Sequence, residues 1–199
     1  MDKSELLAKK QELVAIAARA YRENLQTNTG GNLSVRLESV AACVIKPSGV
    51  GFAECSVDNL MVVGLDGTIL EGTLKPSKDL GFHLEIYRIR SEVKAIVHVH
   101  SAWATGWASA GREVPCVTIH SKAKLKKIPV VPTAPGGGPQ TEQQVGEIFK
   151  DTAIIAAVFA DHGSIGVAKS LLSALHIVEL IEETAHIATV RAIVSNRSG

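Results

Sequence analysis

The stretch Ala95-Ile96-Val97-His98-Val99-His100 predicts a buried strand that ends in two histidines. Alternate side chains of a strand project from the same face, so the two imidazoles lie side by side, about 6 to 7 Å apart along the chain. Neutral imidazole nitrogens bind Zn²⁺ at about 2.0 to 2.1 Å, and a catalytic zinc site combines three protein ligands with an open position. Histidines at a strand end also form simple hydrogen bonds to the backbone. The pair alone therefore leaves metal binding and a structural role open.

A third histidine lies at a comparable position later in the chain. His162 follows the apolar residues 153–160 and precedes Gly163, which places it at the end of another predicted strand. Turns contain histidine often, so this position by itself indicates little. It nevertheless supplies a candidate for the third metal ligand.

Three short polar segments are compatible with binding an anion. Pro76-Ser77-Lys78-Asp79 opens a helix predicted at 78–90, and the free N–H groups and dipole of a helix start favour a group such as phosphate. An ordinary helix cap is the commoner use of such a sequence. Gly30-Gly31-Asn32 and Ser48-Gly49 are likewise compatible with simple turns.

The rest of the chain alternates short strands with amphipathic helices. Its spacing predicts helices at 4–24, 78–90, 102–110, 141–150 and from Ser170 toward the C-terminus, and strands at 33–36, 43–45, 61–65, 68–70, 95–100, 116–119, 128–131, 153–160 and 164–167. Residues 132–139 are expected to form a Pro/Gly loop. No repeat or clean linker interrupts the pattern, so we expect one domain of mixed α and β layers, residues 1–199.

Composition excludes several classes of protein. The 199 residues contain 21 Lys plus Arg and 20 Asp plus Glu, a net charge of +1 that gives no reason to expect a nucleic-acid or membrane partner. No apolar stretch approaches the roughly 18 to 20 residues of a membrane span, and the N-terminus has no signal core, so we expect a cytoplasmic protein. Three cysteines without a C-x-x-C spacing argue against disulfides and a thiolate zinc site.

Five segments in a fixed order give a more specific indication. They are T-x-T-G-G-N-L-S at 27–34, I-K-P-S-G-V at 45–50, E-G-x-x-K-P-S at 71–77, H-V-H-S at 98–101 and D-H-G at 161–163. Together they resemble the class II aldolase/adducin family over nearly the whole chain. The resemblance implies a single mixed α/β domain in which helices flank a central, largely antiparallel sheet.

The resemblance also implies a site and a reaction. The implied roles are one Zn²⁺ per chain held by His98, His100 and His162, proton transfer by Asp79, and phosphate binding by Asn32, Ser48, Gly49 and Ser77. Lys78 is not part of the family pattern, but its position next to Ser77 predicts that it adds a positive charge for the phosphate. The implied activity is that of a zinc-dependent aldolase, a lyase that cleaves a ketose phosphate such as L-fuculose 1-phosphate through a metal-stabilised enediolate. The alternatives are a sugar-phosphate epimerase, dehydratase or decarboxylase, or a non-catalytic adducin-like module. Retention of all three histidines argues against the module.

The sequence departs from the family pattern at three places. Lys78-Asp79 stands where the family's aldolases carry Ser-Glu, although the epimerase has Asp at the acidic position, and Lys122 stands where the epimerase has Asp. The family's tail tyrosine has no counterpart after the last predicted helix of this sequence. The two tyrosines of the sequence, Tyr21 and Tyr87, lie far upstream of that helix. Because the resemblance implies a homotetramer with shared sites, we expect His120 or Lys122 of a neighbouring chain to fill that role. Other histidines, at 83, 176 and 186, are expected to be packed or surface residues.

Overall fold

The computed structural model describes residues 1–132 and 138–196, and its centre is one eight-stranded sheet. The strand order is β4-β3-β2-β1-β5-β8-β7-β6, and every neighbouring pair is antiparallel except β6 and β7. The strands are β1 Asn32–Arg36, β2 Ala42–Ile45, β3 Met61–Gly64, β4 Ile69–Glu71, β5 Ala95–Val99, β6 Val130–Val131, β7 Ala156–Phe159 and β8 Gly163–Ala168. The expected mixed α/β fold with a largely antiparallel sheet is confirmed.

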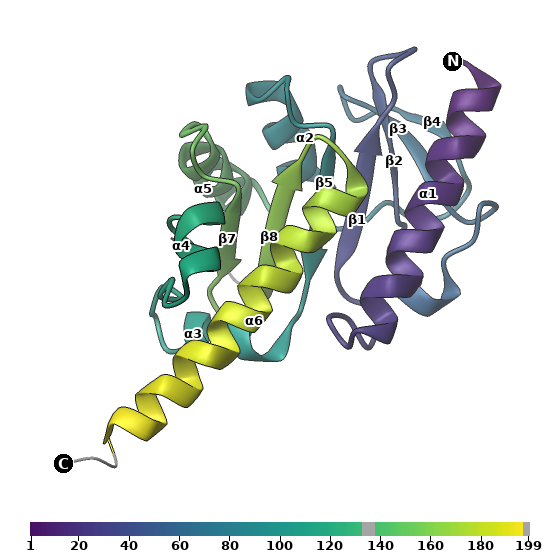
Figure 1. The fold of residues 1–199 in the computed structure, drawn as a ribbon. Coiled ribbons are helices and arrows are strands. Elements are labelled where there is room, and N and C mark those ends of the chain that lie inside the picture. Colours follow the sequence, from purple (N-terminus) through teal and green to yellow (C-terminus); the bar gives the residue numbers. More distant parts are fainter. Residues whose placement is uncertain (133–137, 197–199) are drawn as a thin grey trace.

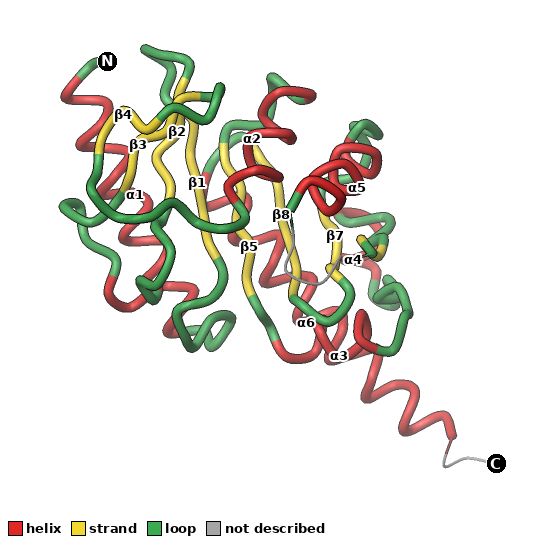
Figure 2. The backbone as a smooth tube through the Cα atoms, turned by 180° about the vertical axis from the view of Figure 1, so that it is seen from behind, coloured by secondary structure: helices red, strands yellow, loops and turns green. Residues whose placement is uncertain are grey.

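Helices cover both faces of this sheet. Helices α1 and α6 lie on one face and α2 and α5 on the other, as the views from the front and from behind show (Figures 1 and 2). The helices are α1 Lys3–Arg22, α2 Leu80–Ile89, α3 Ala102–Ser109, α4 Ile119–Lys124, α5 Pro139–Phe149 and α6 Leu171–Asn196, and a 3-10 turn spans Phe52–Glu54. No helix of the described ranges is long and apolar enough to cross a membrane.

The alternation of β5 divides its side chains between two cores. Val97 and Val99 belong to the apolar cluster beneath α1 and α6, and Ile96 belongs to the cluster beneath α2 and α5. His98 falls on the second face by the same period of two, and its ring packs edge-on against Phe82 and Phe159. The first histidine of the pair is therefore a core residue at the end of a buried strand.

The strand predicted at 116–119 is wrong. Thr118 instead caps α4, because its hydroxyl accepts the Ser121 N–H at 3.1 Å and the Ser121 hydroxyl accepts the Thr118 N–H at 3.2 Å. This reciprocal capping box outweighs the β-branched composition of the segment. Helix α5 begins at Pro139, two residues before the predicted start, and most of the predicted loop at 132–139 lies outside the described residues.

A carboxylate from α6 caps the helix that follows β5. Glu182 accepts the N–H groups of Trp103 at 3.0 Å and Ala104 at 2.9 Å, and the Ser101 side chain makes no such cap. A negative charge at a helix start also interacts favourably with the helix dipole. This contact fixes the turn between β5 and α3, which contains His100.

We expect Glu182→Ala to lower the free energy of unfolding by about 0.5 to 2 kcal/mol, the range seen when a side chain that caps a helix N-terminus is lost. Glu183→Ala changes an exposed residue of the same helix and should stay within about 0.5 kcal/mol of the parent. Urea denaturation of the three proteins measures both effects. Equal midpoints for the two variants would show that Glu182 is not a stabilising cap.

Candidate active site

One ring nitrogen of His98 has a hydrogen-bond partner and the other has none. Nδ1 lies 2.9 Å from the carbonyl oxygen of Ser164, and since a carbonyl only accepts, Nδ1 carries the proton and donates. Nε2 is then a bare acceptor, and it is buried without a hydrogen-bond partner in the described structure. Burial, followed by the neighbouring His162 and His100, holds the pKa of His98 well below its usual value. A neutral, oriented imidazole with a free lone pair is the form that binds a metal ion.

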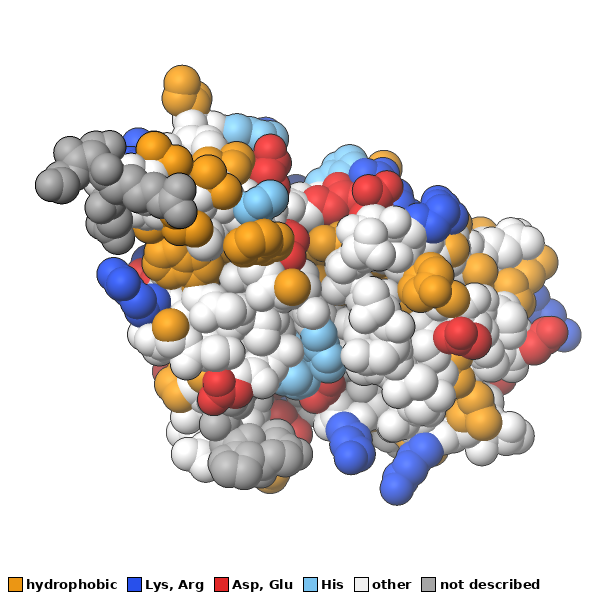
Figure 3. Space-filling model, turned by 90° about the horizontal axis from the view of Figure 1, so that it is seen from below, with side chains coloured by type: hydrophobic (Ala, Val, Ile, Leu, Met, Phe, Trp, Pro, Cys, Tyr) orange, Lys and Arg blue, Asp and Glu red, His pale blue; other side chains and the backbone are white. Residues whose placement is uncertain are grey.

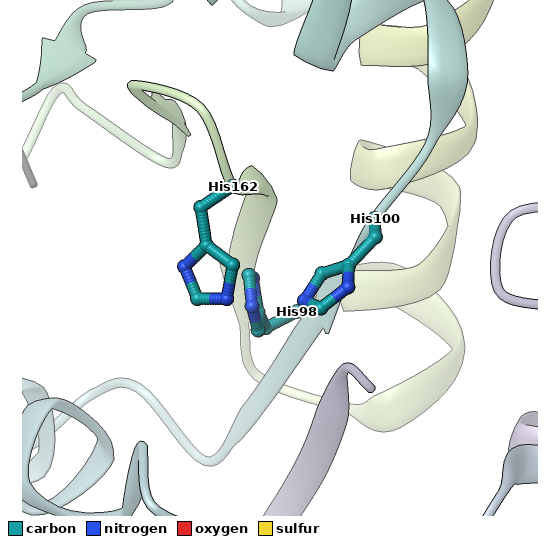
Figure 4. Close-up of side chains that lie close together, drawn as sticks. All are labelled: His98, His100 and His162. Atoms are coloured by element: carbon teal, nitrogen blue, oxygen red, sulfur yellow. The ribbon is translucent and has the colours of Figure 1, made fainter. Parts of the chain in front are cut away.

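The two other histidines converge on the same point (Figure 4). Their ring centroids lie 5.0 Å (His100) and 4.7 Å (His162) from that of His98, and one ligand nitrogen from each of the three lies within 4.8 Å of the others. Burial, and next the charge of His162, lowers the pKa of His100 to about 4. The donor set of three imidazoles fits zinc or another first-row metal ion. The three residues that the sequence singled out are thus brought together in a group that could hold a metal.

Two glycines make room for these rings. A Cβ atom on Gly30 would lie 2.5 Å from Cε1 of His100, and one on Gly163 would lie 2.3 Å from the carbonyl oxygen of Val99. Real Cβ atoms do not approach other heavy atoms so closely. Close packing of the histidine group therefore requires glycine both in the T-G-G-N segment and in the D-H-G segment.

Asp79 lies beside the histidine group. The antiparallel pairing of β1 with β5 places Asn32 directly opposite His98. The Asn32 side-chain NH₂ lies 2.7 Å from Oδ2 of Asp79, and the same oxygen lies 3.8 Å from Nε2 of His98. From this end of the sheet, histidine side chains are visible in a hollow of the surface with acidic side chains next to them (Figure 3).

The residues expected to bind phosphate lie on adjoining segments. Pro47 and Pro76 form an isolated bridge, and the Ser48 N–H donates to the carbonyl of Lys75 at 2.9 Å, so Ser48 and Gly49 run beside the start of α2. The Ser77 hydroxyl lies 3.0 Å from the Asn32 NH₂. Gly49 and Lys78 are exposed, and a pocket of about 420 Å³ opens between residues 27–29 and 49–51.

Sequence reasoning missed Lys46, which lies inside the I-K-P-S-G-V segment. Its ammonium group is buried and donates to the carbonyl oxygens of Thr29 at 3.2 Å, Pro47 at 3.1 Å and Val50. Burial lowers the pKa of Lys46, and the charge of Asp79 opposes that shift. The lysine ties together the two loops that border the pocket. Lysine is so rarely buried that composition gives no signal for such a role.

The ordered motifs also match a known family. The family model described as "Class II Aldolase and Adducin N-terminal domain" matches residues 11–189. The chain belongs to this family. The resemblance of the five sequence segments to class II aldolases is thereby confirmed, and the family's known members include aldolases and epimerases.

Two curated relatives and one solved structure show the range of similarity. A 5-deoxy-D-ribulose 1-phosphate aldolase from Bacillus thuringiensis serovar kurstaki is 32% identical over 182 residues, 92% of this chain and 84% of its own. The L-ribulose-5-phosphate 4-epimerase UlaF of Salmonella paratyphi B is also 32% identical, over 85% of this chain and 78% of its own. The solved structure of an L-fuculose 1-phosphate aldolase matches 94% of this chain and 87% of its own with a TM-score of 0.87 and 28% identity.

We expect the purified protein to contain about one divalent metal ion per chain. His100→Ala should reduce metal content severely without unfolding the protein, because the two apolar clusters do not depend on the ion. His176→Ala, at an exposed position of α6, should keep the metal content of the parent and is the matched control. Elemental analysis after dialysis against zinc measures all three, and full metal retention by His100→Ala would exclude this ligand.

Proposed function

We propose that the chain, residues 1–199 acting as one catalytic domain, is a zinc-dependent aldolase that cleaves a ketose 1-phosphate such as L-fuculose 1-phosphate. The products are a compound of the dihydroxyacetone-phosphate type and an aldehyde. One observation carries the proposal: a carboxylate oxygen of Asp79 lies 3.8 Å from the unpartnered Nε2 of His98. A proton-transfer group thus adjoins a three-histidine metal site, and the names of two relatives, a 5-deoxy-D-ribulose 1-phosphate aldolase and an L-fuculose 1-phosphate aldolase, support the substrate class.

In this proposal His98, His100 and His162 hold the ion. A bound zinc ion would supply Lewis acidity toward the negative charge that develops on the ketose oxygens during cleavage. In cleavage the hydroxyl group of the departing carbon loses its proton to a second proton-transfer group, the carbon–carbon bond breaks, and the protonated carboxyl group of Asp79 donates a proton to the carbon that loses its bond partner. In the reverse, condensing direction the Asp79 carboxylate takes that proton back. Asn32 holds the carboxylate in place through its NH₂ group.

The phosphate group is assigned to Ser48 and Gly49 and to the start of α2, and of these residues Gly49 also lines the pocket. Because the Ser48 N–H is already bonded to Lys75, Ser48 offers its hydroxyl, whereas exposed Gly49 offers its backbone N–H. Ser77 adds a second hydroxyl and Lys78 a positive charge. The buried ammonium of Lys46 adds a fixed charge behind the loops, which favours a dianion at short range.

Epimerisation of a sugar phosphate is the second candidate. The similarity to an epimerase, together with an aspartate rather than a glutamate at position 79, favours it. Lys122, at a position where the resemblance implies an aspartate in the epimerase, argues against it. Analysis of the products separates the two reactions, because only the aldolase releases an aldehyde.

We further propose a homotetramer in which a neighbouring chain supplies the second proton-transfer group. Within one chain Tyr87 is 1% exposed and its hydroxyl is bonded to Ser34, so it has no access to substrate. His120 and Lys122 are exposed on α4 and are the candidates for reaching a neighbouring site. A closed ring of head-to-tail contacts gives each copy the same shared site.

Asp79→Asn keeps the shape of the side chain and removes its proton-transfer capacity. We expect turnover to fall by about 10²- to 10⁴-fold while metal content stays at the level of the parent. Asp58→Asn, which changes an exposed carboxylate, is the control and should leave turnover unchanged. The assay is aldehyde release from a panel of ketose 1-phosphates. Parental turnover in Asp79→Asn would remove this residue from the mechanism.

Light scattering should report about four times the chain mass of 21.1 kDa at micromolar concentration. Mixing an inactive Asp79→Asn protein with an inactive His120→Ala or Lys122→Ala protein, after dissociation and reassembly, should restore part of the activity. Restoration follows because some sites then combine intact residues from two chains. A fully active monomer would contradict the shared site.

A further inference from the structure

A row of polar side chains on β1 meets a row on α2. Asn32 and Ser34 are two residues apart on a strand and face the same side, and Asp79, His83 and Tyr87 follow at four-residue intervals along one face of a helix. Successive distances are 2.7 Å from Asp79 Oδ2 to Asn32 Nδ2, 2.5 Å from Asn32 Oδ1 to His83 Nε2, 2.7 Å from His83 Nδ1 to Ser34 Oγ, and 2.7 Å from Ser34 Oγ to the Tyr87 hydroxyl. The groups form one continuous chain that ends at Asp79.

Behind Asp79 this row of hydrogen-bonded side chains is sealed from solvent. Ser34 and His83 are 0% exposed, and Asn32 and Tyr87 are 1% exposed. Polar groups in such a place must satisfy one another, because an unpaired buried donor or acceptor costs about 1 to 3 kcal/mol. Each of these buried groups must therefore find its donor or acceptor within the row.

The direction follows from the carboxylate. Asp79 only accepts, so the Asn32 atom that faces it is the NH₂ group, and the Asn32 carbonyl oxygen must face His83. His83 therefore donates from Nε2. Burial lowers the pKa of His83 to about 3, so the ring is neutral and Nδ1 is bare. Ser34 must then donate to Nδ1, and Tyr87 must donate to Ser34.

We propose that His83, backed by Ser34 and Tyr87, is a positioning residue that locks the Asn32 amide in one orientation and thereby aims the Asp79 carboxylate at the histidine group. With the amide turned over, its carbonyl oxygen would face the carboxylate, and two acceptors would meet with no proton between them. The same turn would place the Asn32 NH₂ group against the Nε2–H of His83, so that two donors would meet with no acceptor between them. The catalytic consequence rests on the proposed function, in which Asp79 transfers the proton.

The tautomer of His83 tests the direction of the chain without any substrate. Long-range ¹H–¹⁵N spectra of the metal-loaded protein at neutral pH should show His83 protonated at Nε2 and bare at Nδ1. The Asn32 NH₂ resonances should shift in His83→Met, which has no donor, and stay near the parental values in His83→Gln, whose amide NH₂ can replace the Nε2–H. An Nδ1–H tautomer or a charged ring would overturn the proposal.

Kinetics test the catalytic consequence. His83→Met should lower kcat by about 10²-fold at parental KM and metal content, since a small displacement of a catalytic group has that scale of effect. His83→Gln should recover most of the loss. Ser34→Ala should cost about tenfold, and Tyr87→Phe less, because Ser34 still donates to His83 in that variant. Ile86→Val removes a buried methyl group from the same helix and lowers stability, but it changes none of the hydrogen-bonded side chains from Asp79 to Tyr87. This variant should keep the parental kcat.

The outcomes separate this proposal from the proposed function. A parental kcat in His83→Met, or a His83→Gln protein no better than His83→Met at equal stability, would overturn the positioning role. A parent that cleaves none of the ketose phosphates but shows the Nε2–H tautomer and the Asn32 shifts would refute the proposed function and support the positioning of Asp79.

Discussion

The antiparallel pairing of β1 with β5 is the constraint on which the site depends. The backbone ladder sets Asn32 opposite His98, so the distance between Asn32, which holds Asp79, and the fully buried His98 is fixed. The ladder also brings the T-G-G-N segment against His100, where any side chain on Gly30 would collide with the ring. A slip of one residue would turn Asn32 and Ser34 to the opposite face, which would abolish both the hydrogen bond to Asp79 and the contact with His83.

Burial then sets the charge states around this ladder. His83, His98 and His100 are held neutral mainly by loss of solvent, and each neutral ring has one donor and one acceptor nitrogen. At His83 both nitrogens are paired, which makes it a fixed support. At His98 only Nδ1 is paired, which leaves Nε2 directed at the hollow. The same physical effect thus produces a support in one place and a candidate metal ligand in another.

The hydrophobic periodicity of the sequence was sufficient to predict most helices and strands and the face of the sheet on which His98 lies. It failed where a local cap or a contact between two elements determined the structure. Residues 116–119 have strand composition, yet two hydroxyls close a capping box and start a helix. His83 has the pattern of a packed helical residue, and it is packed, but its partners lie on a strand about 50 residues away. The spacing of Asp79, His83 and Tyr87 was visible in the sequence. The hydrogen bonds that these residues make to Asn32 and Ser34 depend on where β1 lies relative to α2, and the spacing of residues along the sequence does not give that position.

The buried part of the site does not choose between carbon–carbon cleavage and epimerisation. An aldolase and an epimerase are each 32% identical to this chain, and in the proposed mechanism both reactions would need charge stabilised on neighbouring substrate oxygens and a carboxylate held beside them. Those needs are matched by residues with little or no exposure, which the sheet and α2 fix. The choice must then come from residues that touch the departing or returning half of the substrate. In this chain the candidates, Lys78 on the rim of the site and His120 and Lys122 on α4, are all exposed and have basic side chains. An imidazole such as that of His120 can accept the hydroxyl proton that is released as the carbon–carbon bond breaks, whereas a lysine ammonium group can only donate. In the proposed tetramer, in which α4 of a neighbouring chain would reach the hollow, His120 is therefore the candidate for that step of cleavage.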